Sequence, residues 1–204
     1  VVLFSIFIYF GLTNMPWLPL IFIYGLIGYR IGGFKLSLTI IASFMFITFT
    51  GVLPQALLSI YLCGIAVIIS FILGASLGIW AAHNDKVSAF MRPINDTMQT
   101  MPSFVILIPF VMFFGIGEFT ALLAIIAYAF VPAMRYTEHG LRNLPETVIE
   151  AARMIGCSQA QLLWKVKIPL AMPVIMLGLN QTIMFGLAML VIAALVGTTG
   201  LGQL

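Results

Sequence analysis

The ionisable side chains of this protein gather in one stretch, residues 135–167. It holds eight of the fifteen Lys, Arg, Asp and Glu residues. The sequence has no Gly-x-x-x-x-Gly-Lys-Ser/Thr motif and so predicts no phosphate-binding loop. His83 and His139 have no neighbouring ligands at metal spacing, and Cys63 and Cys157 are expected to be free thiols. We therefore expect no catalytic residue, metal site or cofactor in this chain, and predict that it is not an enzyme.

The middle of this polar stretch has the pattern of a short capped helix. Pro145 suits the first turn of a helix, where its missing N–H costs nothing. Glu146 then lies near the positive end of the helix dipole. Glu146, Glu150 and Arg153 share one helix face by their i, i+4 and i+3 spacing. Gly156 is predicted to end the helix in a left-handed conformation.

A second helix is predicted to follow this glycine turn. Ser158 and Gln161 have the spacing of a capping box, and the helix is expected to run towards Pro169. The small side chains of Ala151 and Ala152 would allow the close approach of a partner surface. The alternative is a solvated amphipathic loop that binds no partner. A loop of this length in a chain with so few polar residues favours a functional role.

The composition places the elements around this loop in a lipid bilayer. Of the 204 residues, 62% are hydrophobic and 7% are charged, against about 25% charged in an ordinary soluble domain. The net charge of +3 comes from nine basic and six acidic residues. So few basic residues are interpreted as markers of membrane topology and not as a binding surface for an anionic partner. Nucleic-acid binding is not supported.

Seven apolar runs are candidates for membrane segments, since about 20 helical residues cross a hydrocarbon core of about 30 Å. They lie at residues 1–13, 16–29, 35–52, 55–82, 99–114, 119–134 and 172–196. We interpret residues 1–52 as peripheral N-terminal helices and residues 53–204 as the core domain. The first two runs are short, and a single bent or re-entrant element is the competing interpretation.

The basic residues predict the orientation of these segments. If residues 135–171 are cytoplasmic, alternation places residues 30–34 and 83–98 on the same side. These regions, with Lys35 at a border, contain all nine Lys and Arg residues. Cytoplasmic loops carry such an excess of basic residues. The loop 135–171 is therefore expected in the cytoplasm.

The polar loop also carries a specific resemblance. Its residues Glu150-Ala151-Ala152, Gly156 and Val166-Lys167-Ile168-Pro169 resemble the EAA loop of ABC importer permeases, with the family's spacing throughout. Val166 and Ile168 depart from the usual Ile and Leu, and both remain apolar. The resemblance implies a coupling helix that docks into an ATPase subunit. It assigns coupling roles to Glu146, Glu150, Ala151, Ala152 and Gly156.

This resemblance implies the fold and the partners as well. The expected fold is an all-α polytopic transmembrane bundle of the type I ABC importer permease kind. The implied partners are two ATPase subunits that bind ATP and Mg, a second permease copy in a homodimer, and an extracytoplasmic substrate-binding protein or domain. The implied location is the bacterial inner membrane, and ATP hydrolysis is expected to occur in the partner.

Residues 74–203 resemble the permeases of glycine betaine, proline betaine and choline importers. The supporting strings include Met98-Gln99-Thr100-Met101-Pro102 and Asn180-Gln181-Thr182-Ile183-Met184. The resemblance implies uptake of a compatible solute or quaternary amine, with a role in osmoprotection. One alternative is an importer of an amino acid or other small solute. Another is an ion-coupled secondary transporter, which would predict ionisable residues inside the apolar segments; none is evident there.

Two further groups of residues are candidate sites. Asn180, Gln181 and Thr182 form a polar cluster in the last apolar run, where they either hydrogen-bond between helices or line the translocation path. Gly197 and Gly200 lie near the expected outer end, where they mark either an outer gate or a flexible turn. The first residue is not Met and the last follows an apolar run, so we expect a piece of a longer protein that continues beyond residue 204.

Overall fold

The computed structural model describes residues 17–194, and all the regular structure in that range is helical. The elements are α2 (Trp17–Phe49), α3 (Leu53–His83), α4 (Asp85–Thr100), α5 (Ser103–Phe114), α6 (Glu118–Arg142), α7 (Glu146–Met154), α8 (Gln159–Gln161), the π-helix η1 (Leu162–Lys167) and α9 (Ile168–Ala194). The predicted all-α fold is confirmed.

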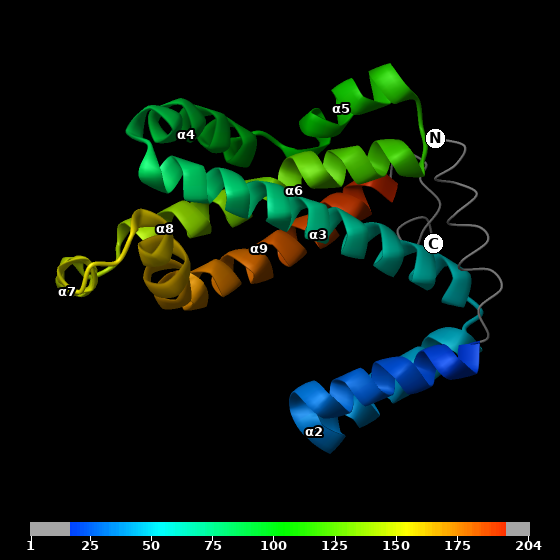
Figure 1. Cartoon of the computed structure of the whole chain (residues 1–204). Helices are drawn as coiled ribbons and strands as arrows, with labels where there is room; N and C mark the ends of the chain where they lie inside the picture. The colour runs from blue at the N-terminus through cyan, green and yellow to red at the C-terminus, as the bar shows by residue number, and fades with distance from the viewer. Residues whose placement is uncertain (1–16, 195–204) are drawn as a thin grey trace.

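The core of the bundle is formed by three long helices, with α6 packed between α3 and α9 (Figure 1). Leu62 and Ala66 of α3, Ile125 of α6 and Met189 of α9 meet in a fully buried apolar cluster. Helices α4 and α5 lie along the other side of α6, and α7 projects from one end (Figure 1). The fold therefore surrounds α6 with neighbours over most of its length.

Glycines bring α3 and α6 into backbone contact. A Cβ added at Gly74 would lie 2.5 Å from the carbonyl oxygen of Phe130, and one at Gly78 would lie 2.6 Å from that of Met134. Small residues permit this close approach between membrane helices, where van der Waals packing replaces the hydrophobic effect as the attraction.

Replacing Gly74 with Val is expected to force α3 and α6 apart. Overpacking of this kind costs about 1–3 kcal/mol, so the melting temperature of the detergent-solubilised protein should fall by several degrees. Gly64→Val on the same helix is the matched control, because nothing lies within 4 Å of a Cβ at Gly64. Equal melting temperatures for the two variants would contradict this account of the interface.

The N-terminal element α2 is folded back on itself. The backbone leaves the helical region at Gly32 and Gly33, and Gly33 has a φ of 72°. The Ser37 hydroxyl donates to the Gly25 carbonyl at 2.8 Å, although residues twelve apart in a straight helix are separated by about 18 Å. The two arms coincide with the predicted runs 16–29 and 35–52. Each arm is about 22 Å long, shorter than a hydrocarbon core of about 30 Å.

By length and composition, four helices in the described range could cross a membrane, namely residues 21–49, 53–83, 118–142 and 159–194. The first of these contains the fold at Gly32 and Gly33. Helices α4 and α5 form a fifth candidate, bent by 99° at the break between them. The bundle is therefore that of a multi-pass membrane protein.

Three predicted boundaries differ from the structure. Residues 85–100, expected to be mainly a cytoplasmic loop, form helix α4, because the Asn84 side chain caps its first turn by accepting from the N–H groups of Lys86 and Val87. The run 99–114 is broken at Met101–Pro102, which leaves α5 only 12 residues. Helix α6 continues to Arg142, so the first part of the expected loop 135–171 is helical.

Candidate functional site

The segment between α6 and α9, residues 143–167, projects from the bundle as an elbow and contains the predicted coupling residues. Pro145 caps α7, which begins at Glu146, one residue later than a first-turn proline implies. At the other end Gly156 has a φ of 89°, which confirms the predicted left-handed turn. The Gly156 N–H donates to the Arg153 carbonyl at 2.9 Å, and the Cys157 N–H donates to the Ala152 carbonyl at 3.3 Å. These two bonds form a Schellman motif, which sets the angle of the chain leaving α7.

The second half of the elbow is joined directly to α9. The predicted capping box is confirmed: the Ser158 hydroxyl accepts from the Gln161 N–H at 3.3 Å, and the Gln161 side chain accepts from the Ser158 N–H at 3.0 Å. The helix then passes through the π-helical turn η1 into α9 without a break, giving 36 helical residues from Gln159 to Ala194. The elbow is therefore joined to the last long helix without an intervening loop.

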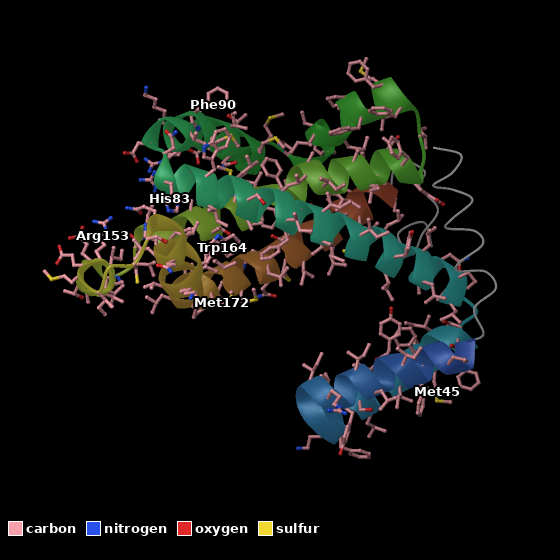
Figure 2. The ribbon with its side chains drawn as sticks, viewed as in Figure 1. Met45, His83, Phe90, Arg153, Trp164 and Met172 are labelled. Carbon is pink, nitrogen blue, oxygen red and sulfur yellow. The ribbon has the colours of Figure 1, made fainter. Side chains whose placement is uncertain are left out.

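Helix α7 presents a surface that no other described part of the chain covers. None of its residues is buried, and Met154 and Ile155 at its end are 91% and 84% exposed. Figure 2 shows Arg153 at the outer end of the elbow, away from the bundle. The structure thus brings the five predicted coupling residues together on one exposed projection. Its small and apolar side chains are suited to contact with another protein.

Replacing Gly156 with Ala is expected to weaken this turn. An L-residue in the left-handed region costs about 1–2 kcal/mol, so local opening should become several-fold more frequent. Hydrogen–deuterium exchange of the amides of residues 155–158 would measure the change. Gly64→Ala, at a helical glycine with open space around it, is the control. Unchanged exchange at the elbow would show that the turn does not depend on glycine.

A cavity of about 670 Å³ that is open to the surface lies between α4, α6 and α9. Its lining residues are Gln99 of α4, Pro132, Arg135, Tyr136 and His139 of α6, and Gln181 and Phe185 of α9. Arg135 is the single charged residue in this lining. Its guanidinium donates to the Gln99 side chain, and to the Asp96 carboxylate at 2.5 Å. Helix α4 thereby holds the guanidinium at the edge of the cavity.

A second polar cluster lies next to this cavity and ties α3, α4 and α6 together. Glu138, with a side chain 11% exposed, accepts from the Ser88 hydroxyl at 2.5 Å and pairs with Arg142 at 3.0 Å. Arg142 also donates to the Ala81 carbonyl at 2.7 Å and pairs with Asp85 at 2.8 Å. Buried charges require partners of this kind, because desolvation otherwise makes them costly.

Sequence reasoning missed both polar clusters. It assigned residues 83–98 and 135–171 to loops, where charged side chains need no explanation. The helical spacing of Arg135, Glu138 and Arg142, at i, i+3 and i+7, was the signal that these residues share one face of an extended α6. Their partners on α4 had no signal of comparable strength, because the turn at Asn84 between α3 and α4 determines how α4 folds back.

The predicted cluster at residues 180–182 is divided by the helix surface. Asn180 is exposed, Gln181 lines the cavity and Thr182 is fully buried. The Thr182 hydroxyl donates to the Gly178 carbonyl of its own helix at 2.8 Å, so it forms an intrahelical bond where an interhelical one was considered. Only Gln181 faces the cavity. Gly197 and Gly200, the candidate outer gate, lie outside the described residues.

Known proteins are similar to this chain over the helices that form the elbow and the cavity. The family model for the binding-protein-dependent transport system inner membrane component matches residues 74–204. The chain is 39% identical to the glycine betaine/proline betaine transport system permease protein ProW of Escherichia coli, over 95% of this chain and 54% of that protein. It is 44% identical to the trimethylamine N-oxide transport system permease protein TmoV of Pelagibacter ubique, over 86% of this chain and 24% of that protein.

A third relative is covered over more of its length. The chain is 38% identical to the glycine betaine transport system permease protein OpuAB of Bacillus subtilis, over 95% of this chain and 68% of that protein. It spans about half the length of ProW and about a quarter of TmoV.

Solved structures show the same fold. The MetNI methionine ABC transporter, in an inward-facing conformation, matches with a TM-score of 0.68 at 21% identity, over 74% of this chain and 77% of that one. An amino acid ABC transporter crystallised with histidines matches with a TM-score of 0.65 at 18% identity, over 78% of each chain. The family match, the elbow and this fold agree, and the chain therefore belongs to the family of binding-protein-dependent transport system inner membrane components.

Proposed function

We propose that this chain is the membrane-embedded permease subunit of an ATP-driven importer for compatible solutes that carry a methylated ammonium or amine oxide group. Its relatives support this cargo class by name: ProW and OpuAB are glycine betaine permeases, and TmoV is a trimethylamine N-oxide permease. Proline betaine is a chemically similar candidate, whereas choline shares the quaternary ammonium group alone. ATP and Mg would act in a separate ATPase subunit.

The observation that carries the coupling role is the exposed elbow. Helix α7 projects beyond the bundle with Ala151 exposed and Ala152 half-buried, so a partner surface can approach its backbone closely. The Schellman turn and the capping box hold this helix at a set angle to α8. In the proposed mechanism Glu146, Glu150, Ala151, Ala152 and Gly156 contact the ATPase or orient the contact.

Movement of the elbow would reach both walls of the cavity. Helix α6 enters the elbow at Arg142, and α9 leaves it through η1. These two helices supply six of the seven lining residues of the cavity. When the ATPase subunits close, a push on α7 would therefore rearrange α6 against α9. The proposed transport step is this rearrangement, which opens the cavity to one side of the membrane at a time.

The remaining partners and the orientation belong to the same proposal. A second copy of the chain would complete the pathway as a homodimer, two ATPase subunits would dock on the two elbows, and an extracytoplasmic binding protein or domain would deliver the solute. The elbow would lie in the cytoplasm of a bacterial cell, as the distribution of the nine basic residues indicates.

The experiment that tests this function is solute-stimulated ATP hydrolysis. The full-length permease would be purified with its ATPase and binding protein and reconstituted in lipid vesicles. Adding glycine betaine is expected to raise the hydrolysis rate several-fold and to cause ATP-dependent uptake of labelled glycine betaine. Stimulation by amino acids or other unrelated solutes alone would show that the proposed cargo class is wrong.

A further inference from the structure

The cavity between α4, α6 and α9 combines one cationic group with two aromatic rings. Arg135 and Tyr136 come from α6, and Phe185 comes from α9. We propose that this cavity binds the solute directly during transport, and that the solute must carry both an anionic oxygen and a methylated ammonium group. The oxygen would accept from Arg135, and the ammonium would lie against Tyr136 and Phe185. This proposal rests on the proposed function and names the cargo subsite within the permease.

The guanidinium of Arg135 has donors left for a ligand. Arginine has five N–H donors in a planar fork. Two of them are directed at Gln99 and Asp96, which leaves three. The Arg135 side chain is 43% exposed, so these donors can be reached from the cavity. A carboxylate or an amine oxide oxygen matches this fork through charge-assisted hydrogen bonds.

The two aromatic rings are held in place by their own neighbours. Tyr136 lies against Gly178, where an added Cβ would be 2.7 Å from the Tyr136 Cβ. Phe185 stacks on Tyr128 with ring centroids 5.1 Å apart. Rings that are already packed lose little entropy when a ligand binds. Their faces attract a quaternary ammonium through the cation–π interaction, worth about 0.5–2 kcal/mol.

The charge of the lining predicts which solutes are accepted. Apart from Arg135, the lining consists of two amide side chains, a histidine, a proline and the two rings. A cation without an anionic oxygen, such as choline, would bring a second positive charge close to Arg135 and would offer its free donors only a neutral hydroxyl oxygen. A zwitterion such as glycine betaine satisfies both the guanidinium and the rings. The volume of about 670 Å³ is ample for a molecule of this size.

The test is direct binding of labelled solutes to the permease–ATPase complex in lipid nanodiscs, without the binding protein. The unmodified complex is expected to bind glycine betaine about tenfold or more tightly than choline, since a hydrogen bond to a charged group is worth about 1.5–3 kcal/mol. Arg135→Gln should reduce this preference to about twofold or less. Phe185→Leu should weaken glycine betaine binding several-fold, and Phe185→Tyr should restore most of it.

Matched controls separate the subsite from general damage. Arg30→Gln removes an exposed arginine on α2, and Phe113→Leu removes an exposed phenylalanine on α5, so both should keep unmodified affinities. Because Arg135 also holds α4 against α6, its variant could misfold. Phe185→Leu leaves every ion pair of the bundle in place and removes only the ring stacking on Tyr128, so this variant then decides the result.

The outcomes distinguish this proposal from the proposed function. Equal affinity for choline and glycine betaine in the unmodified complex would overturn it. It would also be overturned if Arg135→Gln and Phe185→Leu bound glycine betaine with the affinity of the unmodified complex. If the complete complex with its binding protein still takes up glycine betaine in either case, the proposed function stands and only the cavity assignment fails. If the complete complex takes up no methylated ammonium solute, the proposed function itself fails.

Discussion

Replacing Glu150 with Lys is expected to lower ATP-dependent solute uptake by about tenfold or more while the protein still inserts in the membrane. Glu150 is exposed on α7, next to Ala151, in the part of the elbow proposed to contact the ATPase. It makes no ion pair with another described residue. Its substitution should therefore leave the bundle intact. In a docked interface, a reversed charge costs several kcal/mol through like-charge contacts, and a loss of about 1.4 kcal/mol already reduces binding tenfold.

The measurement is labelled solute uptake into vesicles together with ATP hydrolysis by the same complex. The Glu150→Gln variant keeps the size of the side chain and should retain more uptake than the Lys variant. Gln159→Lys on α8 adds a positive charge beyond the Gly156 turn and serves as the control for charge alone. Rates of uptake and ATP hydrolysis in Glu150→Lys equal to those of the unmodified complex would contradict the coupling role of α7.

Replacing Arg142 with Leu is expected to destabilise the bundle strongly. The substitution removes the donor to the Ala81 carbonyl and leaves the Glu138 carboxylate, 11% exposed, with only the Ser88 hydroxyl as a partner. Removing one member of a buried ion pair costs about 3–5 kcal/mol. We expect the lower end of that range because the Arg142 side chain is 29% exposed. The melting temperature of the solubilised protein should fall by about 10 °C.

A second substitution tests the cause of this loss. Glu138→Leu in the Arg142→Leu background removes the unpaired carboxylate and should recover more than half of the lost melting temperature, because replacing both partners of a buried pair is often nearly neutral. Asp85→Asn removes the partner that is 92% exposed and should change little. A double variant that melts below the single variant would show that the carboxylate is not the source of the instability.

The elbow could be predicted from the sequence in detail because its determinants are local. The left-handed turn at Gly156 and the capping box of Ser158 and Gln161 depend on residues at most five positions apart. Glycine is the residue favoured where φ is positive. A serine hydroxyl and a glutamine amide three residues later form a capping box at the start of a helix. Such patterns act through the backbone of one short segment, so no distant residue has to be known.

The sequence predicted the apolar character of the long helices equally well, but it did not predict the turns and ends of these helices. The runs 16–29 and 35–52 were predicted as separate segments, and the fold at Gly32 and Gly33 that brings them together was not predicted. The start of α4 depends on the Asn84 side chain, which the hydropathy pattern does not reveal. The apolar run 119–134 predicted that this helix ends at residue 134, which placed Arg135 and Glu138 in a loop. Helix α6 continues for about two further turns, to Arg142.

The cavity and its polar neighbours were decided by the tertiary structure alone. Arg135 meets Asp96 and Gln99 across 39 and 36 positions, and Ser88 meets Glu138 across 50. These contacts form because the chain folds back at Asn84 and places α4 against α3 and α6. The sequence by itself determined a membrane protein with a capped elbow, since hydrophobicity and turn chemistry are local properties. Which polar residues share a site depended on how helices pack over long separations, and that is a property of the folded bundle.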